Sequence, residues 1–291
     1  MIELLTRLRT PRDISAPQIA LELGVGTATT SLTLLVLAFS GVAWVGIGPV
    51  VLGPLPAILA VGGVLVGPAA VVGGTLGLFL YQLLHAVVAP LELLEALLFG
   101  ATVAFVWNSF ESAETRERRP LSRLARLTAA VGVASLWTAV VYAFAVQLTG
   151  TFSFYPTAAF VALNTALSAV LVGGPFLTAA AVLSKVVDLP RLTTVTQAML
   201  RFRSGTGREV VGPLSAVALG WFVLGSGLSI GFQLTELIPP FHFRLRDLGY
   251  LLFLKSEAMG HGGATVQVGL GVACLVLSAF VVRRRLRSEA N

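Results

Sequence analysis

Residues Val50–Ala86 read VVLGPLPAILAVGGVLVGPAAVVGGTLGLFLYQLLHA, and these 37 residues include no Asp, Glu, Lys or Arg. A single α-helix of this length would extend for about 55 Å, whereas the hydrocarbon core of a bilayer is about 30 Å thick. The stretch is therefore too long for one membrane crossing. We expect it to fold back on itself inside the membrane.

The break in this stretch is expected at Gly67-Pro68. Proline removes a backbone donor, and it moves the residue before it out of the helical region. The sequence therefore predicts a short helix at about Leu55–Val66 and a longer one at about Pro68–His85. Lipid cannot satisfy the backbone groups that such a break leaves open, so other helices must enclose the pair. A polytopic membrane bundle follows.

The composition supports the same class. Hydrophobic residues make up 56% of the 291 residues and charged residues only 12%, and the mean hydropathy is +0.87. A typical soluble domain is about 25% charged. We therefore expect a multi-pass protein of the cell membrane that is surrounded by lipid. The net charge of +6 does not indicate a nucleic-acid partner, because the basic residues cluster beside the apolar runs.

The apolar runs predict an all-α fold, a polytopic transmembrane helix bundle of about eight spans. The predicted spans are Thr27–Ile47, Leu55–Val66, Pro68–His85, Leu91–Trp107, Leu127–Gln147, Pro156–Leu183, Val211–Phe232 and Ala264–Val282. Three parts follow from them: residues 1–26 as a cytoplasmic amphipathic N-terminal segment, residues 27–186 as a six-helix membrane core with a short broken helix pair at 55–85, and residues 187–291 as a cytoplasmic loop with two further transmembrane helices and a basic tail.

The basic residues predict the orientation. If eight segments cross, all but three of the 20 basic residues lie on one side of the membrane, the exceptions being Arg244, Arg246 and Lys255. Positive charge favours the cytoplasmic side, so both termini are expected in the cytoplasm. If Leu55–Val66 did not cross, the N-terminal arginines and those of the 108–126 segment would face opposite sides. The charge pattern therefore favours a true crossing by this short helix.

Polar side chains at membrane depth predict a binding site, because they are costly to leave unpaired in lipid. Glu92 and Glu95 lie one helical turn apart, and Tyr81 and His85 end the preceding span. A tight turn at Pro90 brings these groups together around an outward-facing cavity, with carboxylates for a cationic group and aromatic rings for stacking. The candidate substrate-binding residues are Tyr81, His85, Glu92, Glu95 and Asn164. The alternative is that Glu92 and Glu95 merely occupy the first turn of a helix, where the helix dipole favours acids.

The sequence predicts no catalytic residue, metal site or cofactor. Gly227–Gly231 matches the G-x-S-x-G pattern, but that pattern needs a strand-to-helix turn and here lies within an apolar helix. Two histidines and two carboxylates between residues 233 and 263 have a spacing that fits no standard metal site. The single cysteine, Cys274, excludes a disulfide within one chain. We expect that the protein is not an enzyme.

Residues 27–186 resemble the S component, the substrate-binding membrane subunit, of energy-coupling factor vitamin transporters. The resemblance rests on Gly53-Pro54-Leu55-Pro56 and Gly67-Pro68 in the broken helix pair, and on a sixth span that opens with Tyr155-Pro156 and continues Ala162-Leu163-Asn164-Thr165-Ala166-Leu167-Ser168. It implies six helices with both termini inside and capture of a small water-soluble nutrient from outside. Transport would require a coupling membrane subunit and ATPases as partners. Residues 187–291 depart from this pattern.

Two functions are therefore considered. The first is the substrate-binding component of an uptake system for a vitamin-like or amine-like small molecule. The second is a non-transporting membrane scaffold or sensor. It would engage a cytoplasmic partner or anionic lipid through the arginine-rich segments Arg116–Arg126 and Arg283–Arg287. Positive-inside charge alone also explains these arginines.

Overall fold

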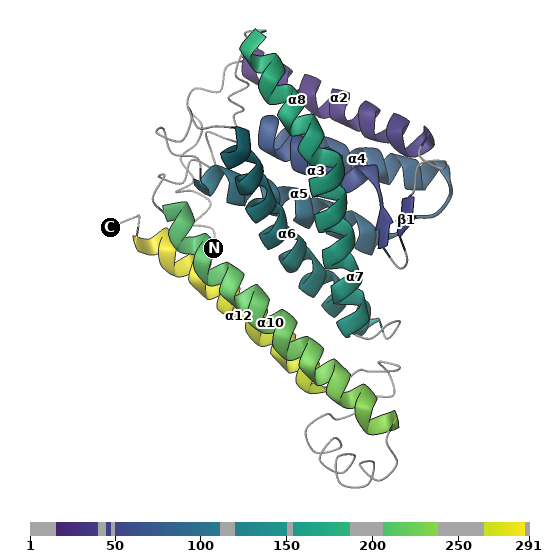
Figure 1. Cartoon of the computed structure of the whole chain (residues 1–291), viewed down its shortest axis with the longest axis vertical. Coiled ribbons are helices and arrows are strands. Elements are labelled where there is room, and N and C mark those ends of the chain that lie inside the picture. Colours follow the sequence, from purple (N-terminus) through teal and green to yellow (C-terminus); the bar gives the residue numbers. More distant parts are fainter. Residues whose placement is uncertain are drawn as a thin grey trace.

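A computed structural model describes residues 16–39, 45–47, 50–110, 120–149, 154–186, 206–237 and 265–288, and within these ranges the chain is almost entirely helical (Figure 1). The elements are α2 (Ala16–Phe39), β1 (Val45–Ile47), β2 (Val50–Leu52), α3 (Pro54–Leu65), α4 (Pro68–Leu84), α5 (Pro90–Phe110), α6 (Pro120–Leu148), α7 (Phe154–Leu167), the π-helical turn η3 (Ser168–Val172), α8 (Gly173–Val186), α10 (Thr206–Leu237) and α12 (Thr265–Ser288). The predicted amphipathic start, residues 1–15, lies outside the described residues, as do the polar segments 111–119, 187–205 and 238–264.

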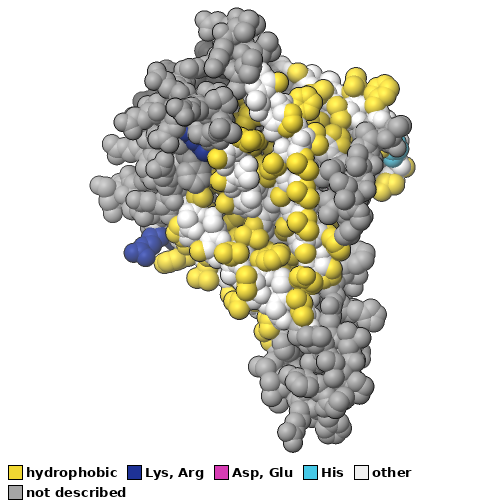
Figure 2. Space-filling view, viewed as in Figure 1, with side chains coloured by type: hydrophobic (Ala, Val, Ile, Leu, Met, Phe, Trp, Pro, Cys, Tyr) yellow, Lys and Arg dark blue, Asp and Glu magenta, His cyan; other side chains and the backbone are white. Residues whose placement is uncertain are grey.

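The structure confirms an all-α membrane protein. Six stretches of the described helices are long and apolar enough to cross a membrane: Ala20–Phe39, Pro90–Trp107, Leu124–Leu148, Phe154–Ala179, Val210–Ile230 and Val266–Arg284. Helices α3 and α4 are apolar but shorter. Hydrophobic side chains cover much of the described surface that faces the viewer in Figure 2. Such a surface suits lipid rather than water. The crossing of α3 and the cytoplasmic termini stay predictions.

The predicted break lies at Gly67-Pro68, and α3 and α4 begin and end within one residue of the expected bounds. Gly67 has φ 99° and ψ −157°, a region that only glycine adopts readily. The backbone N–H groups of Val66 and Gly67 both donate to the carbonyl oxygen of Gly62, at 2.9 and 3.0 Å. These two bonds close the end of α3, and in the first turn of α4 the N–H of Ala70 donates to the carbonyl oxygen of Gly67 at 3.1 Å.

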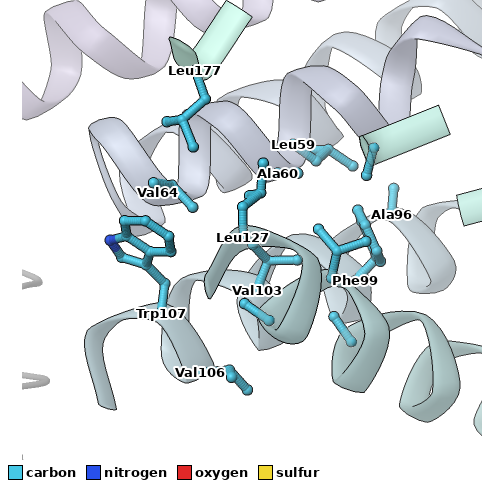
Figure 3. Close-up of a cluster of buried hydrophobic side chains, with 14 of the residues drawn as sticks. Leu59, Ala60, Val64, Ala96, Phe99, Val103, Val106, Trp107, Leu127 and Leu177 are labelled. Carbon is cyan, nitrogen blue, oxygen red and sulfur yellow. The ribbon is translucent and has the colours of Figure 1, made fainter. Parts of the chain in front are cut away.

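Helix α3 lies at the centre of the bundle. It packs against α5, η3, α4, α8 and α2, and Leu59 and Ala60 are 1% and 0% exposed. Figure 3 shows Leu59, Ala60 and Val64 of α3 among side chains from three other helices: Ala96, Phe99, Val103, Val106 and Trp107 from α5, Leu127 from α6, and Leu177 from α8. The short helix is thus enclosed by its neighbours, as the sequence predicts.

The first helix differs from its predicted bounds. The expected span was Thr27–Ile47, whereas α2 runs from Ala16 to Phe39 and its apolar part begins at Ala20. The 20 residues from Ala20 are already long enough to cross a bilayer, because one residue adds about 1.5 Å. Residues 45–47 instead form β1, which pairs with β2 in antiparallel register, Val45 opposite Leu52. Residues 20–26, expected in the cytoplasmic segment, therefore belong to this helix.

Helices α10 and α12 form a long antiparallel pair along one side of the bundle (Figure 1). The pair packs against α6, and α10 also contacts α5 and α7. A second buried apolar cluster forms there around Trp137, Phe144, Phe154 and Trp221. Cys274 is buried in this cluster as a small apolar side chain.

Candidate functional site

Four of the five candidate binding residues flank the turn between α4 and α5: Tyr81 and His85 before it, and Glu92 and Glu95 after it. The turn closes with two backbone bonds, from the N–H of Val87 to the carbonyl of Gln82 at 3.0 Å and from the N–H of Ala86 to that of Leu83 at 3.1 Å. Ala86 has φ 53°, the left-handed conformation that this helix ending requires. The chain can therefore turn back within a few residues, and Tyr81 and His85 are placed beside the start of α5.

Gln82 fixes the start of α5 against the end of α4. Its side chain is only 5% exposed. The Nε2 atom donates to Oε2 of Glu92 at 2.8 Å, and Oε1 accepts from the backbone N–H of Ala89 at 3.2 Å. The structure makes Gln82 the residue that positions Glu92.

Tyr81 and His85 are in direct contact, as their spacing predicts. Their ring centroids are 4.2 Å apart, with the planes tilted by 39°. Nδ1 of His85 lies 2.9 Å from the backbone carbonyl oxygen of Tyr81. The histidine is exposed and the tyrosine is partly buried. Two aromatic rings therefore stand together at the end of α4.

The two glutamates differ in their surroundings. Glu92 is exposed, whereas Glu95 is partly buried. Their carboxylates lie close enough for the charge of one to act on the other. Tyr142 of α6 lies within the same electrostatic range of both. The two carboxylates are therefore neighbours, with Tyr142 of α6 in electrostatic range and the Tyr81–His85 pair beside the start of α5. Carboxylates and aromatic rings are groups that bind organic cations.

The helix-start alternative explains Glu92 but not Glu95. Glu92 lies in the first turn of α5, and its N–H donates to the carbonyl of Ala89 at 3.1 Å. Its carboxylate also accepts the bond from Gln82. Both features are those of an acid that stabilises a helix start. Glu95 lies nearly a turn further along α5, where this account no longer applies.

Asn164 lies on a different helix from the other four candidates. It is a partly buried residue of α7, and the main helical neighbours of α7 are α6 and α10 rather than α4 or α5. Tyr142, which is not among the residues predicted from the sequence, lies in electrostatic range of both carboxylates. Its only signal in the sequence was a tyrosine inside an apolar span.

A second polar group joins α10 and α12 to the rest of the bundle. Nε2 of Gln147 donates to Oε1 of Gln267, and Nε2 of Gln267 donates to the carbonyl oxygen of Gly225 at 2.8 Å. The N–H of Tyr155 donates to Oγ of Ser229 at 3.3 Å. Both glutamines are buried. These bonds link α6, α7, α10 and α12, and they act as contacts between helices.

Within the described residues, no three His, Cys, Asp or Glu side chains are grouped so that they could hold a metal ion. Comparison with known proteins gives no match to a protein-family model, to a curated protein or to a solved structure. The function of the protein is therefore inferred from the chemistry and the positions of its own residues.

Proposed function

We propose that this membrane protein binds a small organic cation between α4, α5 and α6, and that it serves as the substrate-binding component of an uptake system. The observation that carries the proposal is the position of Glu95. This carboxylate is partly buried in a candidate span, with Glu92 and Tyr142 in electrostatic range. The predicted orientation places the group at the outer face of the membrane, where a water-soluble ligand arrives.

The physical reason is that a cation would stabilise this arrangement. A carboxylate inside a membrane-spanning segment is costly, and a second carboxylate nearby adds repulsion. A bound cation offsets both effects. The ring faces of Tyr81 and Tyr142 would add cation–π contacts, each worth about 0.5–2 kcal/mol where the ring lies within about 6 Å of the cation.

The transport step is proposed from the resemblance to S components of energy-coupling factor transporters. The sequence offers no nucleotide-binding motif of its own, so the energy would come from partner ATPases through a coupling membrane subunit. Purification from the native membrane with the ATPases bound would support this step. Recovery of a chain that takes up the cation alone would contradict it.

Thermal unfolding in lipid nanodiscs tests the binding proposal. Thiamine, choline and ethanolamine serve as cationic probes, and biotin serves as an anionic control. A cation at a hundred times its Kd should stabilise the protein by about 2.7 kcal/mol. The shift should be lost in Glu95→Gln and retained in Glu22→Gln, which removes a carboxylate of α2 instead. If no cation raises Tm, or if Glu95→Gln responds like the wild type, the proposal is wrong.

The scaffold or sensor function is the second candidate. The basic side chains that the structure describes are Arg126, Arg283 and Arg284, and in Figure 2 the dark-blue basic atoms lie at the left while the cyan histidine lies at the right. One end of the bundle is therefore suited to anionic lipid. This function predicts a higher Tm in anionic than in zwitterionic nanodiscs, with no response to the cationic probes.

A further inference from the structure

One face of α6 has a row of polar side chains that begins near the Glu92 and Glu95 carboxylates and extends into the bundle. Ser135, Thr138 and Tyr142 follow one another at a spacing of three and four residues, which places them on the same side of a helix. Ser135 is 2% exposed and Thr138 is 0% exposed. Because Tyr142 lies near Glu95, the two hydroxyl groups continue from the candidate site toward the middle of the span.

The hydroxyl groups of Ser135 and Thr138 differ in their hydrogen bonding from many others in the described helices. Thr75, Thr128 and Thr178 each donate to the backbone carbonyl four residues earlier, at 2.9, 3.0 and 2.9 Å. Ser135 Oγ and Thr138 Oγ1 are buried and have no hydrogen-bond partner in the part of the chain that the structure describes. A buried hydroxyl group without a partner is costly, even when a carbonyl of its own helix lies nearby.

The distances along α6 from Tyr142 to Thr138 and Ser135 set the length of a ligand that could hydrogen-bond to both hydroxyl groups. Thr138 lies about 6 Å along the helix from Tyr142, and Ser135 lies about 10 Å from it. A molecule whose charged nitrogen pairs with Glu95 would need a hydrogen-bonding group at the far end of a chain of that length.

We propose that Ser135 and Thr138 bind the polar far end of the ligand, so that the substrate class is an elongated amine with a hydroxyl or carbonyl oxygen remote from its charged nitrogen. This inference rests on the proposed function, because Glu95 holds the nitrogen. It adds two specificity-determining residues from the interior of the span.

A matched pair of probes tests the inference. Aminohexanol and hexylamine have the same charge and chain, and only the former has a terminal hydroxyl group. Their affinities are measured by thermal unfolding and by calorimetry on the full chain in nanodiscs. We expect aminohexanol to bind wild-type protein about tenfold more tightly, the value of one good hydrogen bond. The ratio should fall to about one in Thr138→Val, and it should fall in Ser135→Ala. Thr75→Val removes a hydroxyl group of α4 that is already bonded, and it should keep the wild-type ratio.

The stability of the ligand-free variants separates binding from a structural role. Thr138→Val keeps the shape of the side chain and removes an unpartnered buried hydroxyl group, so its ligand-free Tm should equal or exceed that of the wild type. A lower Tm would overturn the inference, as would a wild-type ratio of one or a ratio unchanged in both variants. If wild type bound both amines with equal affinity and Glu95→Gln bound neither, the proposed function would stand and this inference would fail. If neither amine bound, this inference would fail, and the thiamine, choline and ethanolamine probes would then decide the proposed function.

Discussion

The side-chain amides of Gln147 and Gln267 are hydrogen-bonded to each other inside the bundle. Gln147 ends the membrane part of α6, and Gln267 lies near the start of α12. The two residues are 120 positions apart, one in the predicted six-helix core and one in the additional helix pair. Because Gln267 also donates to the carbonyl of Gly225, one side chain holds α6, α10 and α12 together. The additional helices are therefore fixed to the core by polar contacts as well as by apolar packing.

Replacing Gln267 by Ala should loosen this attachment. The change removes the acceptor of Gln147 and the donor to Gly225, and hydrogen bonds between membrane helices are each worth about 0.6–2 kcal/mol. We expect a lower Tm and faster proteolysis between α10 and α12. The double variant Gln147→Leu with Gln267→Leu should recover part of the lost Tm. Replacing both glutamines leaves neither side chain as a buried polar group without a hydrogen-bond partner. Equal Tm values for wild type and Gln267→Ala would show that the bond carries no stability.

The conformation of Gly67 predicts a large effect for a small substitution. Gly67→Ala must hold φ 99° and ψ −157° with a Cβ atom, at a cost of about 1–3 kcal/mol. Gly132→Ala is the control, because its Cβ would meet nothing within 4 Å in the middle of α6. That control should be neutral or slightly stabilising. Thermal unfolding of both variants checks the pair, and a Gly67→Ala protein as stable as Gly132→Ala would contradict the strained break.

The sequence could predict the break and the enclosure of α3, because both follow from local rules. Gly67-Pro68 breaks an apolar run that is too long for one crossing, whereas the same dipeptide at Gly212-Pro213 lies inside the continuous helix α10. An uncharged 12-residue helix such as α3 must be covered by protein at its open ends. The contact between Tyr81 and His85 follows equally from their spacing of four residues. These features depend on neighbours in the chain.

The remaining parts of the candidate site depend on contacts between distant segments. Tyr142 lies near Glu95 because α6 packs against α5, and nothing in the sequence selects this tyrosine. Asn164 has the right residue type but lies on α7, outside the α4–α5 turn. The free hydroxyl group of Thr138 depends on a side-chain rotamer, which the residue pattern does not show.

Ala86 offers a stabilising substitution. It adopts φ 53°, where an L-residue with a Cβ atom is about 1–2 kcal/mol less favourable than in a right-handed conformation. Ala86→Gly should therefore raise Tm by relieving the end of α4. Ala70→Gly, in the first turn of α4, removes a buried methyl group and should lower Tm instead. If both variants changed Tm in the same direction, the left-handed assignment at Ala86 would be wrong.

The contact between α2 and α4 predicts a second sensitive glycine. A Cβ atom at Gly77 would lie 2.7 Å from the carbonyl oxygen of Thr30 and 2.7 Å from Cβ of Thr33. Because one of these atoms is backbone, Gly77→Ala should push α2 away and lower Tm by about 1–3 kcal/mol. Gly24→Ala, on α2 itself, would meet nothing within 4 Å. Its Tm should match that of the wild type, and an equal loss in both variants would argue against the close helix contact.

The orientation of the broken helix pair can be tested with single cysteines in a Cys274→Ala background. His85 ends α4, Leu65 ends α3, and both are exposed, as is Arg284 near the end of α12. If α3 and α4 both cross, a membrane-impermeant maleimide should label His85→Cys in intact cells, because the α4–α5 turn would face outward. Leu65→Cys and Arg284→Cys should react only after permeabilisation, because positive charge keeps their side in the cytoplasm. Labelling of Leu65→Cys from outside would show that α3 does not cross the membrane. The arginines of the 108–126 segment would then be expected on the opposite side of the membrane.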